Sequence, residues 1–582
     1  MLKKRLLSIC RPRRNPGAPA RCAKVAGILR MPSLGQQQSD QPGLLRHTEC
    51  ACYFDRGFAS PCLRGALPRG VLAPFELRAL SFILAIASCV ASCVAPAAAQ
   101  DVLYAEVTLD KSAAVSAAGD KPLTGRIFLF FSHGKEREPR FGPNWFKPEP
   151  FFRLDVEAIE PGDVRRIDDS AAGFPKPLSK LPAGAYRVQA LLDHDPDSQH
   201  YAQSGGNLYS QVLDWRHDPA SPEPLRLTLD QIVPPRKFVE KPWLKEIRFK
   251  SKSLSEFHGR EVLHLAAVVL PAGYERQPER RYPAIYTIPG FGGTHYDAMR
   301  GFSKQPPAAQ EGETDFIRVM LSADCGWGHH VFADSATNGP RGEALVNELI
   351  PYIDAHFRTV AAPTARFVTG HSSGGWSSLW VQVRYPDVFG GVWSTAPDPV
   401  DFRDWQQVDL YARPRLSLYV DQRSERRPIA RMAGKPVLWY GDFAKMDDVL
   451  GRGCQLRSFE AAFSPLDAAG EPRQMWDRTT GRVDPEVVKA WEAHDIRLYL
   501  ERHWDELAPK LRGKLHVITG EVDTFYLEGA VRLLGESLKA LGSDAEVSVV
   551  AGKDHGNLLT AELVRQIRRQ MSVSFLKHHP TP

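Results

Sequence analysis

Cysteine is scarce over most of this 582-residue chain. Seven of its nine cysteines lie before residue 100, which leaves only Cys325 and Cys454 in the rest of the sequence. The larger part of the chain can therefore form at most one internal disulfide. In an oxidising compartment Cys325 and Cys454 could pair, and two unrelated buried thiols fit the sequence equally well.

An excess of charge of one sign is also absent from the main part of the chain. The formal net charge is +6, but residues 1–99 hold 14 Lys and Arg against 4 Asp and Glu, which leaves −4 for the remaining 483 residues. A nucleic-acid-binding domain needs a basic face. The sequence therefore gives no electrostatic reason to expect a nucleic-acid partner.

Long hydrophobic runs are missing, with one exception near the N-terminus. Residues 80–94 are apolar, Arg78 precedes them, and Ala97-Ala98-Ala99 follows. This order is typical of a secretory signal peptide, and the run is too short and too rich in Ala, Ser and Cys to span a membrane stably. We expect a leader over residues 1–99 and a periplasmic or secreted mature protein.

The leader allows two further interpretations. Residues 1–70 are rich in Arg, Pro, Gly and Cys without a hydrophobic period, so we expect translation to begin later, near Val71, and this segment not to be functional. The segment Ile86-Ala87-Ser88-Cys89 resembles a lipoprotein box, which would leave a lipid anchor on Cys89. We favour the cleaved signal peptide over this anchor.

Residues 100–235 carry short strand-like segments separated by Pro and Gly turns. Aromatic and β-branched residues cluster at 125–131, 185–192 and 225–229. This pattern predicts a small all-β sandwich domain. The paired prolines within 232–236 indicate a linker, because they favour extended chain and interrupt strand pairing.

Residues 236–582 alternate between strand and helix patterns and contain no internal repeat. Predicted strands lie at 262–270, 284–288, 316–321, 366–369, 515–519 and 547–550, and predicted helices at 345–357, 527–541 and 559–567. This alternation predicts an α/β domain with helices on both faces of its sheet. The pattern breaks at about 399–507, which we interpret as a lid-like insertion over the active site.

A nucleophile-elbow motif follows the strand predicted at 366–369. Gly370-His371-Ser372-Ser373-Gly374 fits the pattern G-x-S-x-G, and an amphipathic segment with Trp376 and Trp380 on one face follows it. The motif alone is weak, but it needs a strand before it and a helix after it, and both are predicted here. We therefore expect Ser372 to be a catalytic nucleophile.

A serine nucleophile needs a base, and the base needs an orienting acid. Asp523 and His555 follow the strands predicted at 515–519 and 547–550, in the chain order that the elbow motif requires. Glu521 is the alternative acid. His371 and Asp554 are neighbours of the catalytic positions in sequence, and we expect structural roles for both.

Acyl transfer also needs amide donors for the oxyanion. The N–H of Ser373, directly after the nucleophile, is one candidate. The second should come from Ile288-Pro-Gly-Phe-Gly-Gly293, where glycines let the backbone approach the substrate closely. Phe291 N–H is our first choice and Gly292 N–H the second.

Five segments together resemble the putative esterase family, which groups esterase D-like enzymes, feruloyl esterases, enterochelin esterases and mycolyltransferases. They are Val268-Val-Leu-Pro-Ala-Gly-Tyr274, Tyr282-Pro-Ala-Ile-Tyr-Thr-Ile-Pro-Gly290, Glu348-Leu-Ile-Pro-Tyr-Ile353, the elbow, and Tyr385-Pro-Asp-Val-Phe389. The resemblance covers about 245–395 and returns at Asp523 and His555. It implies an α/β-hydrolase fold and ester hydrolysis through a Ser-His-Asp triad, with no metal and no cofactor. The family usually has His-Gly where this chain has Pro289-Gly290.

The predicted function is that of an exported serine esterase acting on a small-molecule or glycan-linked ester. Two alternatives stay open: acyl transfer to a sugar or another alcohol, and a catalytically inactive protein that binds a glycan or siderophore. A metal site is not favoured, because the spacing of Asp324, His329, His330 and Asp334 matches no ligand template.

Overall fold

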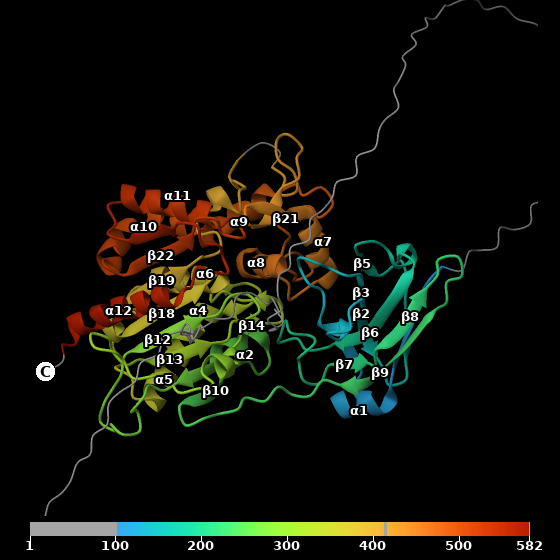
Figure 1. Cartoon of the computed structure of the whole chain (residues 1–582), viewed down its shortest axis with the longest axis horizontal. Helices are drawn as coiled ribbons and strands as arrows, with labels where there is room; N and C mark the ends of the chain where they lie inside the picture. Colours follow the sequence, from blue (N-terminus) through green and yellow to red (C-terminus); the bar gives the residue numbers. More distant parts are fainter. Residues whose placement is uncertain (1–101, 413–415, 581–582) are drawn as a thin grey trace, which may run out of the picture.

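The chain folds into an N-terminal β-rich domain and a larger α/β domain that lie side by side (Figure 1). The computed structural model describes residues 102–412 and 416–580. The predicted leader, its signal peptide and the lipid-anchor site Cys89 lie outside the described residues. No helix within the described ranges is both long and apolar enough to cross a membrane.

The N-terminal domain is built on one nine-stranded sheet. Its hydrogen-bonded order is β4-β1-β9-β7-β6-β2-β3-β5, and β8 also pairs with β6. The strands are β1 (Ala105–Leu109), β2 (Leu123–Ser132), β3 (Phe151–Ile159), β4 (Val164–Ile167), β5 (Ala172–Phe174), β6 (Gly184–Asp193), β7 (Leu208–Ser210), β8 (Leu213–His217) and β9 (Leu225–Ile232).

The prediction of an all-β sandwich is not confirmed in that form. The strands belong to one continuous hydrogen-bonded series, because the long strand β6 pairs with β2, β7 and β8. The domain also contains the helix α1 (Lys111–Ala118), which begins at the N-cap Asp110 and is rich in alanine, the best helix former.

The sheet of the α/β domain has eight strands in the order β10-β11-β13-β12-β18-β19-β22-β23. These strands are β10 (Leu244–Lys250), β11 (Leu263–Val269), β12 (Ala284–Ile288), β13 (Ile317–Leu321), β18 (Arg366–His371), β19 (Gly391–Thr395), β22 (Leu515–Gly520) and β23 (Glu546–Val550). β10 and β11 run antiparallel to their neighbours, and the strands from β13 to β23 are parallel. The predicted α/β fold class is confirmed.

Helices cover both faces of this sheet. α6 (Ser373–Arg384), α11 (Glu528–Ala540) and the run α4 (Arg341–Ala344), η3 (Leu345–Leu349) and α5 (Ile350–His356) pack on the face that carries Tyr286, Val368 and Val517. α12 (Ala561–His578) packs on the opposite face against Phe367 and Ile518. The remaining helices before β18 are α2 (Lys252–His258) and α3 (Asp297–Gly301).

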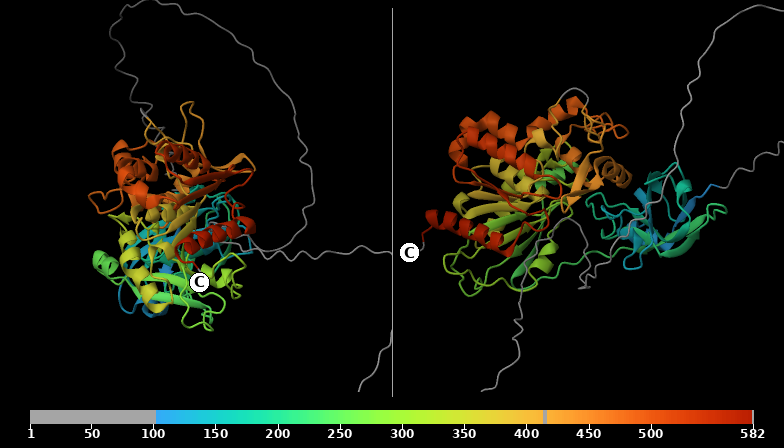
Figure 2. Two further views of the ribbon diagram at one scale, coloured as in Figure 1. Left: turned by 90° about the vertical axis from the view of Figure 1, so that its left-hand side faces the viewer. Right: turned by 45° about the horizontal axis from the view of Figure 1, so that its top comes forward.

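Residues 396–514 connect the adjacent parallel strands β19 and β22 and include the predicted insertion. They form the hairpin β20 (Pro428–Met432) and β21 (Lys435–Trp439), and the helices α7 (Tyr440–Leu450), α8 (Gln455–Phe463), α9 (Pro485–Trp491) and α10 (Ile496–Leu511). Short two-residue strands, β14 (Asp324–Cys325), β15 (Gly328–His329), β16 (Asp334–Ser335) and β17 (Gly339–Pro340), lie in the loop after β13. Part of this connection, with α7 and α8, lies next to the N-terminal domain, whereas α10 lies away from that domain (Figure 1 and Figure 2).

Strand β2 is buried on both faces, and this burial joins the two domains. Ile127, Leu129 and Phe131 point into the N-terminal core. Phe128 and Phe130 point the other way, into the core cluster of the α/β domain. A half-solvated strand would alternate apolar and polar residues, so this uninterrupted apolar run fits a strand covered on both sides.

A buried arginine on the same strand ties the domains together. The Arg126 guanidinium donates to Asp193 Oδ2 at 2.8 and 2.9 Å and to the carbonyl oxygens of Leu450 and Arg452, at 2.9 and 2.5 Å. Arg126 and Asp193 are 3% and 0% exposed. A buried pair of this kind has already given up its hydration, so removal of one partner leaves the other uncompensated.

We expect Arg126→Met to lower the free energy of unfolding by about 3–5 kcal/mol, because Asp193 would stay buried without its counter-ion. The control is Arg226→Met, which removes a largely exposed partner of Glu106 and should cost at most about 1 kcal/mol. Denaturant unfolding measures both. Adding Asp193→Leu to Arg126→Met should recover part of the lost stability. Equal losses of stability in Arg126→Met and in the control Arg226→Met would contradict the prediction.

Candidate active site

Five neighbouring parallel strands deliver the candidate residues to one edge of the sheet. Ser372 directly follows β18, Asp523 follows β22, and His555 follows β23. Phe291 and Asp398 follow β12 and β19 in the same way. Since the carboxyl ends of parallel strands share one edge, the loops that follow them converge there.

The backbone at Ser372 has the strained geometry of a nucleophile elbow. Ser372 has φ 60° and ψ −127°, a left-handed conformation that is uncommon for a residue other than glycine, and α6 begins at the next residue. A Cβ at Gly370 would lie 2.0 Å from Gly374 O, and a Cβ at Gly374 would lie 2.2 Å from Ile288 O. Any side chain at Gly370 or Gly374 would therefore clash with neighbouring backbone atoms.

Asp523 and His555 form a buried hydrogen-bonded pair. His555 Nδ1 lies 2.7 Å from Asp523 Oδ2, and the two residues are 3% and 0% exposed. Burial by itself would raise the pKa of Asp523, but the attraction and hydrogen bond of His555 and the N–H of Phe525 outweigh it and hold that pKa below its ordinary value. Asp523 is therefore ionised at neutral pH.

The same pair raises the pKa of His555. Burial alone would lower the pKa of the imidazole, yet the charge and hydrogen bond of Asp523, followed by the charges of Asp398 and Asp554, raise it above its ordinary value. With Nδ1 directed to Asp523, the second ring nitrogen Nε2 is buried and has no hydrogen-bond partner among the described residues. A neutral His555 can therefore accept a proton at Nε2.

The insertion supports the loop that carries Asp523. Arg431, on β20, donates from Nε to the Asp523 carbonyl oxygen at 2.9 Å and from Nη2 to Glu528 Oε1 at 2.6 Å. Phe525 packs edge-on against the His555 ring, with 5.1 Å between ring centres. These contacts fix the acid and cover one side of the imidazole.

The other acidic and imidazole candidates have different partners. Glu521, the alternative acid, is exposed and accepts the N–H of Gly552. His371 Nε2 lies 3.1 Å from the His555 carbonyl oxygen, and its Nδ1 lies 3.1 Å from Thr395 Oγ1. Asp554 accepts the N–H groups of Gly556 and Asn557. His371 and Asp554 thus contact the backbone of the loop that carries His555.

The glycine-rich loop after β12 runs beside the nucleophile. A Cβ at Gly290 would lie 3.4 Å from Ser372 Cβ and 3.1 Å from His371 O, and Gly292 has φ 76°. The buried His329 fixes the loop by contact of its Nε2 with Pro289 O at 2.9 Å, while its Nδ1 accepts the N–H of Val331. Burial lowers the pKa of His329 to about 4, so the neutral ring makes both bonds.

Asp398 is a buried carboxyl in this site that the sequence analysis did not identify. Ser373 Oγ donates to Asp398 Oδ2 at 2.5 Å, and the Asp398 N–H lies 3.3 Å from Ser372 O. Burial raises the pKa of Asp398 to about 6, against the hydrogen bond of Ser373. Asp523 was predicted because it is an acid that shortly follows a predicted strand. Asp398 follows β19 in the same way, but it was missed because that strand was not predicted.

A pocket with about 430 Å³ of empty space, partly open to solvent, contains Ser372 and Asp398. Its other lining residues come from the insertion, from the loop after β22 and from the N-terminal domain: Trp145, Pro399, Gln406, Ile429, Leu438, Phe443, Gln455, Leu456, Phe459 and Phe525. Ser372 therefore faces a mostly apolar pocket.

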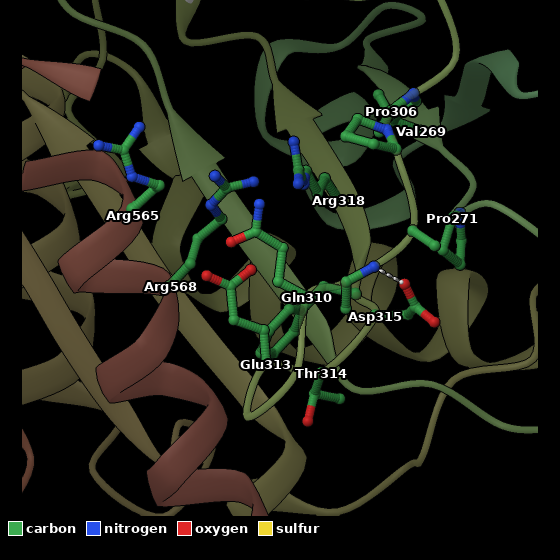
Figure 3. Close-up of a pocket in the computed structure, with 14 residues that line it drawn as sticks. Val269, Pro271, Pro306, Gln310, Glu313, Thr314, Asp315, Arg318, Arg565 and Arg568 are labelled. Atoms are coloured by element: carbon green, nitrogen blue, oxygen red, sulfur yellow. Dashed lines mark hydrogen bonds between the residues drawn. The ribbon is translucent and has the colours of Figure 1, made fainter. Parts of the chain in front are cut away.

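A larger hollow lies elsewhere in the α/β domain (Figure 3). It has about 620 Å³ of empty space between residues 306–316 and α12, and Arg318, Arg565 and Arg568 line it. It does not include the residues of the candidate site. We therefore assign the candidate site to the smaller of these two pockets, because Ser372 lines it.

The cluster discounted as a metal site makes protein contacts. Asp324 accepts from Ser198 Oγ and Gln199 N, and Asp334 accepts from Tyr385 and from the N–H of Gly342. Cys325 and Cys454 are not joined in a disulfide.

The comparisons with known proteins found one matching family model and several similar solved structures. The model of the family described as putative esterase matches residues 264–508. Similar solved structures include a ferulic acid esterase (14% identity, TM-score 0.36, 57% of this chain and 99% of that one) and an S-formylglutathione hydrolase from Agrobacterium tumefaciens (14%, 0.34, 57% and 94%). A ferulic acid esterase from Anaeromyces mucronatus is also similar (15%, 0.31, 59% and 94%).

We expect Gly374→Ala to destabilise the protein by at least about 2 kcal/mol, because its Cβ would meet the carbonyl oxygens of Ile288 and Pro289 at 2.2 and 2.5 Å. The matched control is Gly301→Ala, also a helical glycine, where a Cβ meets nothing within 4 Å. That control should change stability by less than about 1 kcal/mol. Thermal unfolding compares the two, and an unaffected Gly374→Ala protein would contradict the packing described.

Proposed function

We propose that this chain is an exported esterase of the putative esterase family, whose model matches residues 264–508, and that it cleaves carboxylic esters through a Ser372-His555-Asp523 triad. The observation that carries the proposal is the buried 2.7 Å contact between His555 and Asp523 at the same sheet edge as the strained Ser372. The segment before residue 100 supports export to the periplasm or the medium.

In the first step Ser372 Oγ attacks the ester carbonyl carbon while its proton moves to His555 Nε2. Asp523 holds the imidazole in the tautomer with the proton on Nδ1 and stabilises the imidazolium that forms. His555 then protonates the departing alcohol, which leaves an acyl group on Ser372. Water, deprotonated by His555, clears the acyl-enzyme and releases the acid.

The oxyanion of each tetrahedral intermediate is bound by backbone amides. Ser373 N–H lies at the first turn of α6, where the helix dipole favours negative charge. The second donor is the N–H of Phe291, with that of Gly292 as the alternative, since their loop runs so close to Ser372 that a Cβ added at Gly290 would lie 3.4 Å from Ser372 Cβ. Loss of one such donor raises the barrier by about 2.7–4 kcal/mol in comparable sites.

We expect a fluorophosphonate probe to label the protein on Ser372, located by peptide mapping. Ser372→Ala should lose all labelling, because the neighbouring hydroxyl, that of Ser373, is hydrogen-bonded to Asp398 and does not occupy the nucleophile position of the motif. Ser378→Ala, which removes another buried hydroxyl from α6, should keep it. Labelling that persists in Ser372→Ala would overturn the assignment of the nucleophile.

We expect Asp523→Asn to fold normally and to lower kcat for a simple ester by about 10³–10⁴-fold, because the asparagine amide favours the wrong imidazole tautomer. Glu521→Gln, at the exposed alternative acid, should keep kcat within about twofold. Ester hydrolysis followed by pH-stat, with circular dichroism to check folding, distinguishes the two. The opposite order of losses would transfer the acid role to Glu521.

We expect Asp398→Asn to move the acid limb of the kcat/KM profile to lower pH. The charge of Asp398 is one of the causes that raise the pKa of His555, and only the neutral imidazole accepts the serine proton. With the charge removed, the pKa of His555 falls and the imidazole stays neutral to lower pH. Asp230→Asn, on the exposed side of β9, is the control and should leave the profile unchanged; an upward shift in Asp398→Asn would contradict the sign.

A further inference from the structure

The N-terminal domain contributes a side chain to the pocket of the α/β domain. We propose that Trp145 is a specificity-determining residue of the esterase, and that the pocket it completes binds an aromatic or similarly flat apolar group of the ester. This inference rests on the proposed function, because it concerns the substrate of the same nucleophile. It assigns the N-terminal domain a part in the active site, in place of a separate binding role.

Trp145 lies between the oxyanion loop and the insertion. Its ring centre is 5.7 Å from that of Phe291, at an interplanar angle of 38°, and 4.9 Å from that of Phe443, at 72°. Phe291 follows β12, and Phe443 lies on α7. One indole from a different domain therefore bridges the two segments that border Ser372.

The rest of the pocket suits a flat apolar group. Besides Trp145, its apolar wall consists of Ile429, Leu438, Phe443, Leu456, Phe459 and Phe525. Aromatic rings prefer offset or edge-to-face partners, and such contacts add to the energy of burial. The polar lining groups are few: the nucleophile, Asp398, Gln406 and Gln455. An aromatic ester group beside Ser372 could contact this wall, whereas an acetyl or methyl group offers it little apolar surface.

The loop that carries Trp145 is held in place by contacts within the N-terminal domain. Asn144 Oδ1 accepts the N–H groups of Phe146 and Lys147, at 2.9 and 3.1 Å. The Tyr201 hydroxyl donates to the Gly142 carbonyl oxygen, and Tyr201 itself packs against Phe128. Trp145 is thus presented to the pocket by a fixed turn, which lowers the entropy lost on substrate binding.

The N-terminal sheet also positions the other aromatic partner. Arg153 on β3 donates to the carbonyl oxygen of Asp448 at 3.0 Å, and Lys445 donates to that of Pro175 at 2.5 Å. Both contacts hold α7, the helix that carries Phe443. At the end of this helix Gly451 lies so close to Arg153 that a Cβ would overlap the guanidinium. The wall made by Trp145 and Phe443 is therefore one assembly across the domain boundary.

The test compares kcat/KM for methyl acetate with methyl benzoate and with benzyl acetate, so that the aromatic group is placed on the acyl side or the alcohol side. We expect the wild-type protein to favour at least one aromatic ester over methyl acetate. Trp145→Ala should reduce that preference by at least about tenfold, within the range of discrimination that apolar pockets achieve. Trp145→Phe should keep most of it.

The control is Trp215→Ala, which removes an indole of equal size from β8 of the same domain, where it packs against Phe131 and His217. It should leave the preference unchanged. Equal losses on all three esters in Trp145→Ala, or no loss of preference, would overturn the inference. If Ser372 still reacts with fluorophosphonate in that variant, the proposed function stands even when the inference fails. If the wild-type protein is not labelled, the proposed function itself fails.

Discussion

The contact between the elbow backbone and the loop after β12 is the constraint on which the rest of the site depends. A Cβ at Gly374 would overlap the carbonyl oxygens of Ile288 and Pro289, and one at Gly375 would overlap that of Thr395. The start of α6 can therefore fit between β12 and β19 only without side chains at these positions. This fit places the N-terminus of α6 and the loop after β12, which carries the proposed oxyanion donors, next to Ser372.

Much of the α/β domain could be predicted from the sequence, because strands buried on both faces are nearly continuous apolar runs. The segments at 284–288 and 515–519 became β12 and β22 with their boundaries correct or one residue short. β19 was missed because Gly391-Val-Trp-Ser-Thr395 mixes small, polar and aromatic residues, and Asp398 was missed with it. Trp145 carries no local signal, since its partners lie 146 and 298 residues further along the chain.

In the N-terminal domain the strand pattern was recognised from the sequence, but the separate sandwich domain inferred from it was too narrow an interpretation. The run Ile127-Phe-Leu-Phe-Phe131 lacks alternation, which indicates burial on both faces, although a free-standing sandwich would expose one face of each sheet. The structure accounts for the second face: Phe128 and Phe130 pack into the other domain, and Arg126 binds carbonyl oxygens at the end of α7. The domain boundary is therefore a packed interface, and the two domains form one support for the pocket.

Asp398 brings a second carboxyl to the histidine that Asp523 orients. It follows β19, the strand between those that carry Ser372 and Asp523, and its charge is one of the causes that raise the pKa of His555. Above its own pKa of about 6, Asp398 is charged, and this charge would favour the imidazolium that forms during the proposed attack. The same charge raises the pKa of His555, so a larger fraction of the imidazole is already protonated, and unable to act as a base, at a given pH. Because burial holds the pKa of Asp398 near 6, the carboxyl is charged over the same neutral range in which His555 must be neutral to act as a base. The burial of Asp398 beside Ser372 sets its pKa, and that pKa decides over which pH range its charge acts on His555.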